Sequence, residues 1–241
     1  MNAVTQSEIK AVEEVKHEFV TVPETIFPNG TVVPSFKVGK YITGCTDDQL
    51  AINANASPWV EINFIDSKAE AEKAGLKLIT ELQYLALAHN ISGVAINWTS
   101  GIVGEGSLFQ GLHDDTVEEA QPGDYVPEEE SERRWFELSN GERVFDVAGN
   151  CYTWIFDDVQ GDENGIVSSA FTEDSPSITT APAPSYEKGV GWYPKAGSDW
   201  SGDALIRGGC WGSNDHAGVF HLDNDRPGGE GGDVGFRCTL P

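Results

Sequence analysis

The spacing of apolar residues along the chain predicts a series of short elements. In residues 1–20, Ile9, Val12, Val15 and Phe19 recur among charged residues at intervals typical of one helical face. A helix this short needs a surface to pack on. We therefore expect it to contact its own domain or another copy of the chain.

Alternating apolar and polar residues then indicate strands. Residues 20–43 contain the turn signals Phe27-Pro28-Asn29-Gly30 and Val33-Pro34, so we expect short strands and a hairpin there. The run Trp59-Val60-Glu61-Ile62-Asn63-Phe64 predicts a further strand.

Two helix starts follow this run. Ser67 and Glu70 have capping-box spacing, and Gly75 can end that helix. Thr80 and Gln83 repeat the signature at the start of a second helix. The inner positions expected for the second helix are Leu82, Leu85, Ala86 and His89.

The C-terminal segment, residues 205–241, places a mixed polar filling between apolar and glycine positions. The side chains expected to hold it to the core are Val219, Phe220, Leu222, Val234 and Phe236. Trp211, Arg207 and Arg237 fit a buried scaffold better than an exposed rim. Exposed loop residues on a rigid scaffold contribute little to folding, typically within about 0.5 kcal/mol per substitution. This pattern favours a binding face.

Composition narrows the possible partners. The chain has 241 residues, is 39% hydrophobic and contains seven tryptophans, which suffices for a large core. Its net charge of −24 argues against nucleic acid or an anionic membrane as a partner. We expect a soluble protein with no signal peptide and no membrane insertion, because no apolar run approaches the ~20 residues that span a bilayer. Residues 113–143 are strongly acidic and predict a solvated insertion.

Candidate metal and catalytic patterns are weak. The cysteines, which lack the close spacing of a zinc site, are Cys45, Cys151, Cys210 and Cys238. Residues 157–165 gather oxygen-bearing side chains, but without EF-hand spacing, so a solvated loop is favoured over a calcium site. No nucleophile elbow or zinc-protease helix is present.

Three segments together resemble a known family. The first runs from the motif Arg207-Gly208-Gly209 to the motif Gly235-Phe236-Arg237-Cys238. The other two are Ala74–Glu81 and Phe145–Trp154, in which Ile79 and Thr153 depart from the family pattern. The chain resembles the formylglycine-generating-enzyme branch of the C-type lectin fold, and more closely the variable proteins of diversity-generating retroelements. The resemblance implies an α+β domain over residues 35–241, with mixed short strands, two capped helices and long loops. An N-terminal arm of helix plus strand, residues 1–34, would precede it.

The resemblance also implies a function. In such proteins a reverse transcriptase copies a template unfaithfully at adenines, so Asn codons become other codons that end in C. The polar filling largely follows this restriction, although Glu230 departs from it. The implied variable, ligand-binding positions are Cys210, Gly212, Ser213, Asn214, Asp215, His216, His221, Asp223, Asp225, Gly229, Gly231 and Asp233. The implied role is recognition of variable protein or cell-surface targets, with display at a surface or on a virus or phage particle, and with a homo-oligomer as one possible state.

Two other interpretations stay open at this point. A fold-related enzyme would use a cysteine pair, but the matching positions are Ser213 and Gly218, which cannot hold copper or perform thiol chemistry. A structural particle domain is the other. We predict a protein that is not an enzyme and has no cofactor and no metal, and we interpret His216 and His221 as surface variation. Replacing Ser213, Asp215, His216 and His221 together should then leave thermal stability nearly unchanged.

Overall fold

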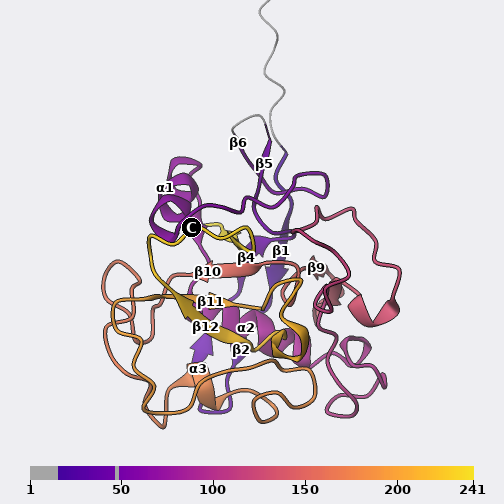
Figure 1. Ribbon diagram of the computed structural model, residues 1–241. Coiled ribbons are helices and arrows are strands. Elements are labelled where there is room, and N and C mark those ends of the chain that lie inside the picture. Colours follow the sequence, from indigo (N-terminus) through magenta and orange to yellow (C-terminus); the bar gives the residue numbers. More distant parts are fainter. Residues whose placement is uncertain (1–15, 47–48) are drawn as a thin grey trace, which may run out of the picture.

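Two four-stranded sheets form the framework of the domain in the computed structural model, which describes residues 16–46 and 49–241 (Figure 1). The first has the order β1-β4-β14-β7, with bounds Phe19–Val22, Phe36–Gly39, Cys238–Thr239 and Lys77–Leu78. The second has the order β12-β11-β10-β13, with bounds Leu222–Asp225, Ala204–Arg207, Tyr152–Ile155 and Val234–Phe236. The C-terminal segment therefore contributes strands to both sheets.

Short hairpins and helices complete the fold. The paired short strands are β2 (Thr25–Ile26) with β3 (Val32–Val33), β5 (Gly44–Thr46) with β6 (Gln49–Ala51), and β8 (Trp135–Glu137) with β9 (Arg143–Phe145). The helices are α1 (Phe64–Lys73), α2 (Glu81–Ser92) and α3 (Pro176–Thr179), with 3-10 turns at Ala95–Asn97, Glu130–Glu132 and Asn214–His216. The predicted α+β class, with short strands, two capped helices and long loops, is confirmed.

Helix α2 starts as predicted and is the central helix of the domain. Thr80 and Gln83 form the expected capping box, with each side chain accepting the backbone N–H of the other residue. Residues 84–88 are all buried, so the helix is enclosed on every side along this stretch. In Figure 1 it crosses behind β11 and β12. This position allows residues at its start to contact the C-terminal segment.

Helix α1 begins four residues earlier than predicted. Its N-cap is Asn63, whose side-chain oxygen accepts the Asp66 N–H at 2.9 Å. Ser67 is fully buried inside the helix and caps nothing. Asn is as good an N-cap as Ser, so sequence spacing alone did not separate the two candidates. The predicted end is confirmed, because Gly75 adopts φ +74° directly after the helix.

The strand predicted over Trp59–Phe64 is wrong. Glu61 has φ +55°, which interrupts an extended conformation. The N–H groups of Glu61 and Phe64 donate to the carbonyls of Gly231 and Pro227 rather than to a neighbouring strand. The segment is therefore an irregular connection that fixes the loop before β13.

At the N-terminal end, Ile9, Val12 and Val15 lie outside the described residues. Phe19, the last member of the predicted helical stripe, starts strand β1 instead, because it pairs with Gly39 of β4. The predicted hairpin is confirmed as β2–β3, with Gly30 at φ +87° in the turn. Residues 19–33 thus pack on the sheet of the domain that follows, while the boundary proposed at residue 34 stays a prediction.

The acidic insertion, residues 113–143, is anchored by buried charges. Most of its acids are exposed, but Glu132 is 2% exposed and accepts the backbone N–H groups of His113 and Asp114. Arg134 forms two 2.7 Å bonds with Asp146 in the core. The insertion is therefore solvated over most of its acids but is fixed to the core at Glu132 and Arg134. Among the described residues, no helix is long and apolar enough to cross a bilayer.

Candidate ligand-binding site

The turn after β11 aims the polar filling away from the core. Gly208 and Gly209 adopt φ +95° and +85°, a region that side chains rarely occupy. A Cβ added to Gly209 would also lie 2.7 Å from Ala217 Cα. The Arg-Gly-Gly motif is thus required by backbone geometry, and residues 210–216 leave the sheet directly after it.

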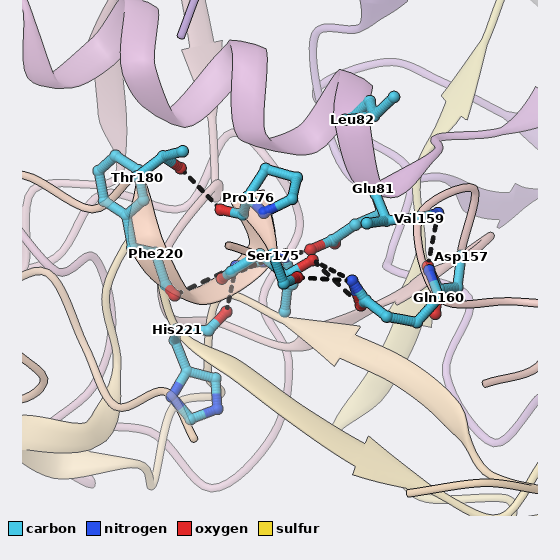
Figure 2. Close-up of polar contacts among 12 residues, drawn as sticks. Glu81, Leu82, Asp157, Val159, Gln160, Ser175, Pro176, Thr180, Phe220 and His221 are labelled. Atoms are coloured by element: carbon cyan, nitrogen blue, oxygen red, sulfur yellow. Dashed lines mark hydrogen bonds and ion pairs between the residues drawn. The ribbon is translucent and has the colours of Figure 1, made fainter. Parts of the chain in front are cut away.

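A buried ion pair holds both ends of this excursion. Arg207 and Glu81 are each fully buried, and Arg207 Nε donates to Glu81 Oε2 at 2.7 Å while Nη2 donates to Oε1. Arg207 Nη1 donates to the carbonyls of Phe220 and His221 at 3.1 and 3.3 Å. Figure 2 shows these two carbonyls turned toward the same interior region. The pair therefore connects α2, β11 and the segment that returns to β12. Arg207 belongs to the buried scaffold, as predicted.

Backbone contacts then fix the course of residues 210–216. Trp211 N–H donates to the Asn150 carbonyl, and the Trp211 carbonyl accepts the Asp115 N–H. Asn214 N–H donates to the His113 carbonyl at 2.7 Å. These bonds do not depend on which side chains the loop carries. The path can therefore persist when the exposed side chains change.

The loop surrounds a shallow depression of about 570 Å³. The residues that line it are Tyr152, Cys210, Gly212, Ser213, Asn214, Asp215, His216 and Asp233. All except Tyr152 belong to the set predicted to vary. The side chains of Asp215 and His216 are 79% and 50% exposed. Residues 210–216 and Asp233 are thus brought together, as the binding-face hypothesis requires.

Two groups that line the depression, Tyr152 and Cys210, stay protonated at neutral pH. Ser213 Oγ lies 3.1 Å from the Tyr152 hydroxyl and 3.3 Å from Cys210 Sγ. Burial raises the pKa of Tyr152 to about 12 and raises the pKa of the Cys210 thiol. Cys210 is therefore a buried, protonated thiol rather than a thiolate nucleophile. Tyr152 was not identified from the sequence, because nothing in the Phe145–Trp154 motif shows which side chain reaches this surface.

His221 is the clear correction to the predicted site. Its side chain is fully buried and lies between the rings of Tyr152 and Trp192, with centroids 5.4 and 6.1 Å away. Nδ1–H donates to the His216 carbonyl at 2.7 Å, and burial lowers the pKa of the imidazole to about 3. Figure 2 shows its carbonyl turned toward the buried network and its ring pointing the other way. His221 supports the site from beneath.

The remaining predicted positions lie beside the depression. Asp223 and Asp225 are partly buried on the edge strand β12. The pKa of Asp223 is raised, because burial outweighs the opposite effect of His216. Gly229 and Gly231 lie in the loop before β13 that contacts the start of α1. They extend the candidate surface without lining the depression.

The glycines of the segment fall into two structural groups. A Cβ added to Gly212 would approach only the tip of Asp115, at 2.8 Å. A Cβ added to Gly218 would clash with the backbone of Val190 and Gly191, because it would lie closer to them than van der Waals contact allows. Gly212 can therefore accept a side chain, whereas Gly218 cannot. A cysteine would therefore not fit at Gly218 either.

The oxygen-rich stretch 157–165 forms capped turns. Asp157 Oδ1 accepts the N–H groups of Val159 and Gln160 at 2.9 Å, and Asp162 Oδ1 accepts those of Asn164 and Ile166. Asp157 is fully buried, and burial together with Glu81 raises its pKa to about 6. The expectation of a solvated loop is therefore wrong for Asp157. Within the described ranges, no group of three or more His, Cys, Asp or Glu residues could hold a metal ion.

Comparisons with known proteins concern the fold only. No protein-family model and no curated protein matches the chain. Among solved structures, PvdO from Pseudomonas aeruginosa is similar, with 14% identity over 92% of this chain and 93% of that one, at a TM-score of 0.49. Treponema denticola variable protein 1 shows 16% identity over 81% of this chain and 53% of that one, at 0.35. The Major Tropism Determinant U1 variant shows 16% over 90% and 51%, at 0.40.

This chain spans about half the length of those two proteins. At such identities and TM-scores, function has to be argued from the site itself.

Proposed function

We propose that this chain is a ligand-binding display protein with a C-type lectin fold, whose C-terminal surface is diversified by retroelement mutagenesis at adenines. The observation that carries the proposal is the depression, which is lined almost entirely by residues that the codon restriction allows to vary. Beneath them, the scaffold is held by backbone bonds and by the buried Arg207–Glu81 pair. Sequence variation and fold stability are thereby assigned to different residues.

The chemistry of the site supports recognition without catalysis. Ser213 contacts Tyr152 and Cys210, and burial keeps both of these groups protonated. His221, which could act as a base, donates its Nδ1–H to a backbone carbonyl and lies beneath the surface. We therefore propose a non-enzymatic protein that needs no cofactor.

A macromolecular target fits this geometry better than a small molecule. Small-molecule sites usually enclose most of their ligand in a concave pocket. Here the depression is shallow, and Asn214, Asp215 and His216 project from its edge. We propose a protein or cell-surface target and display of this chain at a surface, with assembly into a homo-oligomer as a way to present several copies.

The first test is genetic. We would sequence the DNA beside the gene and search for a second copy of the segment that encodes residues 205–241, next to a reverse-transcriptase gene. A copy that differs only where it carries adenine would support the proposal and identify the variable codons. If no copy is found, retroelement diversification is rejected.

The second test uses two matched libraries. The first randomises positions 212, 214, 215 and 216 with codons that end in C, and the control randomises the scaffold positions 208, 209, 217 and 218. We expect most members of the first library and few of the control to fold, measured by resistance to protease on a display particle. Selection on an immobilised protein such as lysozyme should then recover binders from the first library only. Equal folding of both libraries would contradict the division between surface and scaffold.

A further inference from the structure

A second hollow lies next to the depression and has a different chemistry. It has a volume of about 760 Å³ and is formed mainly by Pro184, Tyr186, Trp192, Tyr193, Lys195 and Trp200. We call it the aromatic groove. Its residues lie between positions 184 and 200, outside the segment predicted to bind, and none is among the predicted variable positions.

The rings of the groove are held in place before any ligand arrives. Trp192 stacks on Trp200 with centroids 6.2 Å apart, and Trp200 meets the buried Phe171 edge-on at 5.0 Å. The backbone N–H of Trp192 donates to the His216 carbonyl at 2.9 Å, and the backbone carbonyl of Trp192 accepts the Leu222 N–H at 2.8 Å. Because the rings are already ordered, a ligand would lose little binding energy in fixing them.

The groove is suited to an extended peptide that contains proline. Proline-rich segments bind in grooves lined by aromatic rings, because their polyproline II conformation is already formed before binding. Indole N–H groups can donate to the exposed carbonyls of such a peptide, whereas the Tyr193 hydroxyl already donates to the Ala183 carbonyl at 2.9 Å. The described residues that line the groove include no Asp, Glu, Asn or Gln, so the paired polar acceptors that would fix a sugar are lacking.

The groove continues into the acidic depression. Tyr186 is 45% exposed and meets His216 edge-on, with ring centroids 4.9 Å apart. Beyond His216 the lining of the depression includes Asp215 and Asp233, and the chain as a whole carries a net charge of −24. A peptide that extends from the groove across this contact would therefore place its flanking side chains over carboxylates, which favours lysine or arginine there.

We propose that the aromatic groove is a constant subsite for a proline-containing, extended segment of the target protein, with a basic flank of that segment over Asp215 and Asp233. This inference rests on the proposed display function and extends it. The variable loop carries few aromatic residues, and Trp, Tyr and Arg usually dominate binding energy at interfaces. The groove supplies such residues, while the neighbouring variable positions select among targets.

The test uses synthetic peptides and the indole N–H signals of the full chain in nuclear magnetic resonance spectra. The probe is a short peptide of repeated Pro-Pro-Leu units with two arginines at one end. Its controls are the same peptide with Glu in place of Arg, the same peptide with Ala in place of Pro, and a linear glucose oligosaccharide. Variants Trp192→Phe and Trp200→Phe assign the two signals.

We expect the arginine peptide to shift the Trp192 and Trp200 signals, and the other two peptides to bind at least about tenfold more weakly. Tyr186→Ala should weaken binding by about tenfold or more. Trp135→Phe is the matched control, because Trp135 is a half-buried tryptophan outside the groove, packed between Arg133 and Arg143, and it should leave binding unchanged.

Three results would overturn the inference: no shift of either indole signal at millimolar peptide, equal binding by the Tyr186→Ala variant, or a response to the oligosaccharide alone. If the peptide fails while the library at positions 212, 214, 215 and 216 still yields binders, the groove assignment fails and the display function stands. If both fail, the proposed function fails with it.

Discussion

Two parts of the C-terminal segment were predicted to vary in the same way, yet they differ in burial. In the loop of residues 212–216, the side chains of Asn214, Asp215 and His216 are exposed and backbone bonds hold the path. At His221, five residues further on, the side chain is fully buried between Tyr152 and Trp192. A codon restriction can show which residues are reachable by mutation. Only the course of the backbone shows which of them can change without disturbing the core.

The strongest test of this contrast is to break the scaffold under the loop. Arg207→Met leaves Glu81 as a buried carboxylate without its partner, which typically costs about 3 to 5 kcal/mol. We expect a loss of that size in the free energy of unfolding, measured by urea denaturation. The double variant Arg207→Met, Glu81→Leu should recover much of it. A loss below about 1 kcal/mol for the single variant would show that the pair does not hold the segment.

The glycines offer the next largest effect and a matched control. Gly218→Ala places a methyl group against the backbone of Val190 and Gly191, so we expect a loss of at least about 2 kcal/mol. Gly212→Ala meets only the tip of Asp115 and should change stability by no more than about 0.5 kcal/mol. Thermal unfolding of both variants checks this. Equal losses would remove the distinction between surface and scaffold glycines.

The titration of His221 gives a smaller, pH-dependent effect. Its folded pKa of about 3 lies below the usual value of 6.5, so the unfolded chain binds the proton more readily. The contribution of His221 to the free energy of unfolding is therefore fully present above pH 6.5. It is lost as the pH falls from 6.5 toward 3, because the unfolded chain takes up the proton and the folded chain does not. Between pH 7 and 5, the wild type should lose on the order of 2 kcal/mol more stability than a His221→Gln variant.

The comparison between the two chains is needed because other groups also titrate in this range. His89, with a pKa lowered to about 4 by burial, acts in the same direction, and Asp157, with a raised pKa, acts in the opposite one. Both are present in wild type and variant, so they cancel in the difference. Identical pH profiles for the two proteins would contradict a buried, neutral His221.

The smallest expected effect is on the exposed side of the contrast. Asp215→Ala with His216→Ala should change the free energy of unfolding by no more than about 1 kcal/mol in total, because both side chains are largely exposed. Calorimetry measures it, and Glu128→Ala with Glu129→Ala in the acidic insertion is the matched exposed control. A larger loss in the first pair would show that the loop depends on its side chains.

These results replace the expectation that Ser213, Asp215, His216 and His221 can be exchanged together. His221 is buried, and Ser213 Oγ accepts the Cys210 N–H at 2.8 Å. Either change removes a contact from the interior of the site. We now expect the fourfold variant to be clearly less stable than the Asp215, His216 pair.

How far the sequence predicted the structure depended on whether the signal was local. The capping box at Thr80 involves residues three positions apart, and α2 starts there as expected. The start of α1 was misplaced because Asn63 and Ser67 are both good caps. The irregular course of residues 59–64 depends on bonds to the carbonyls of Gly231 and Pro227, far along the chain, which spacing cannot reveal.

The site followed the same rule. Residues 210–216 are close in sequence and in space, so their grouping was predictable. Burial of His221 depends on the rings of Tyr152 in β10 and of Trp192, and no local pattern shows it. The aromatic groove was missed for the same reason, although the density of Trp, Tyr and Pro in residues 184–200 was a usable signal.

The position of β14 makes folding depend on complete translation of the C-terminal segment. This strand lies between β4 and β7, and it is translated after every position predicted to vary. A ribosome that met a stop codon or a shifted reading frame within residues 210–233 would release a chain whose first sheet lacks an interior strand. Mutagenesis confined to codons that end in C creates no stop codons. Diversification of this kind would therefore yield complete chains, and truncated products would fail to fold.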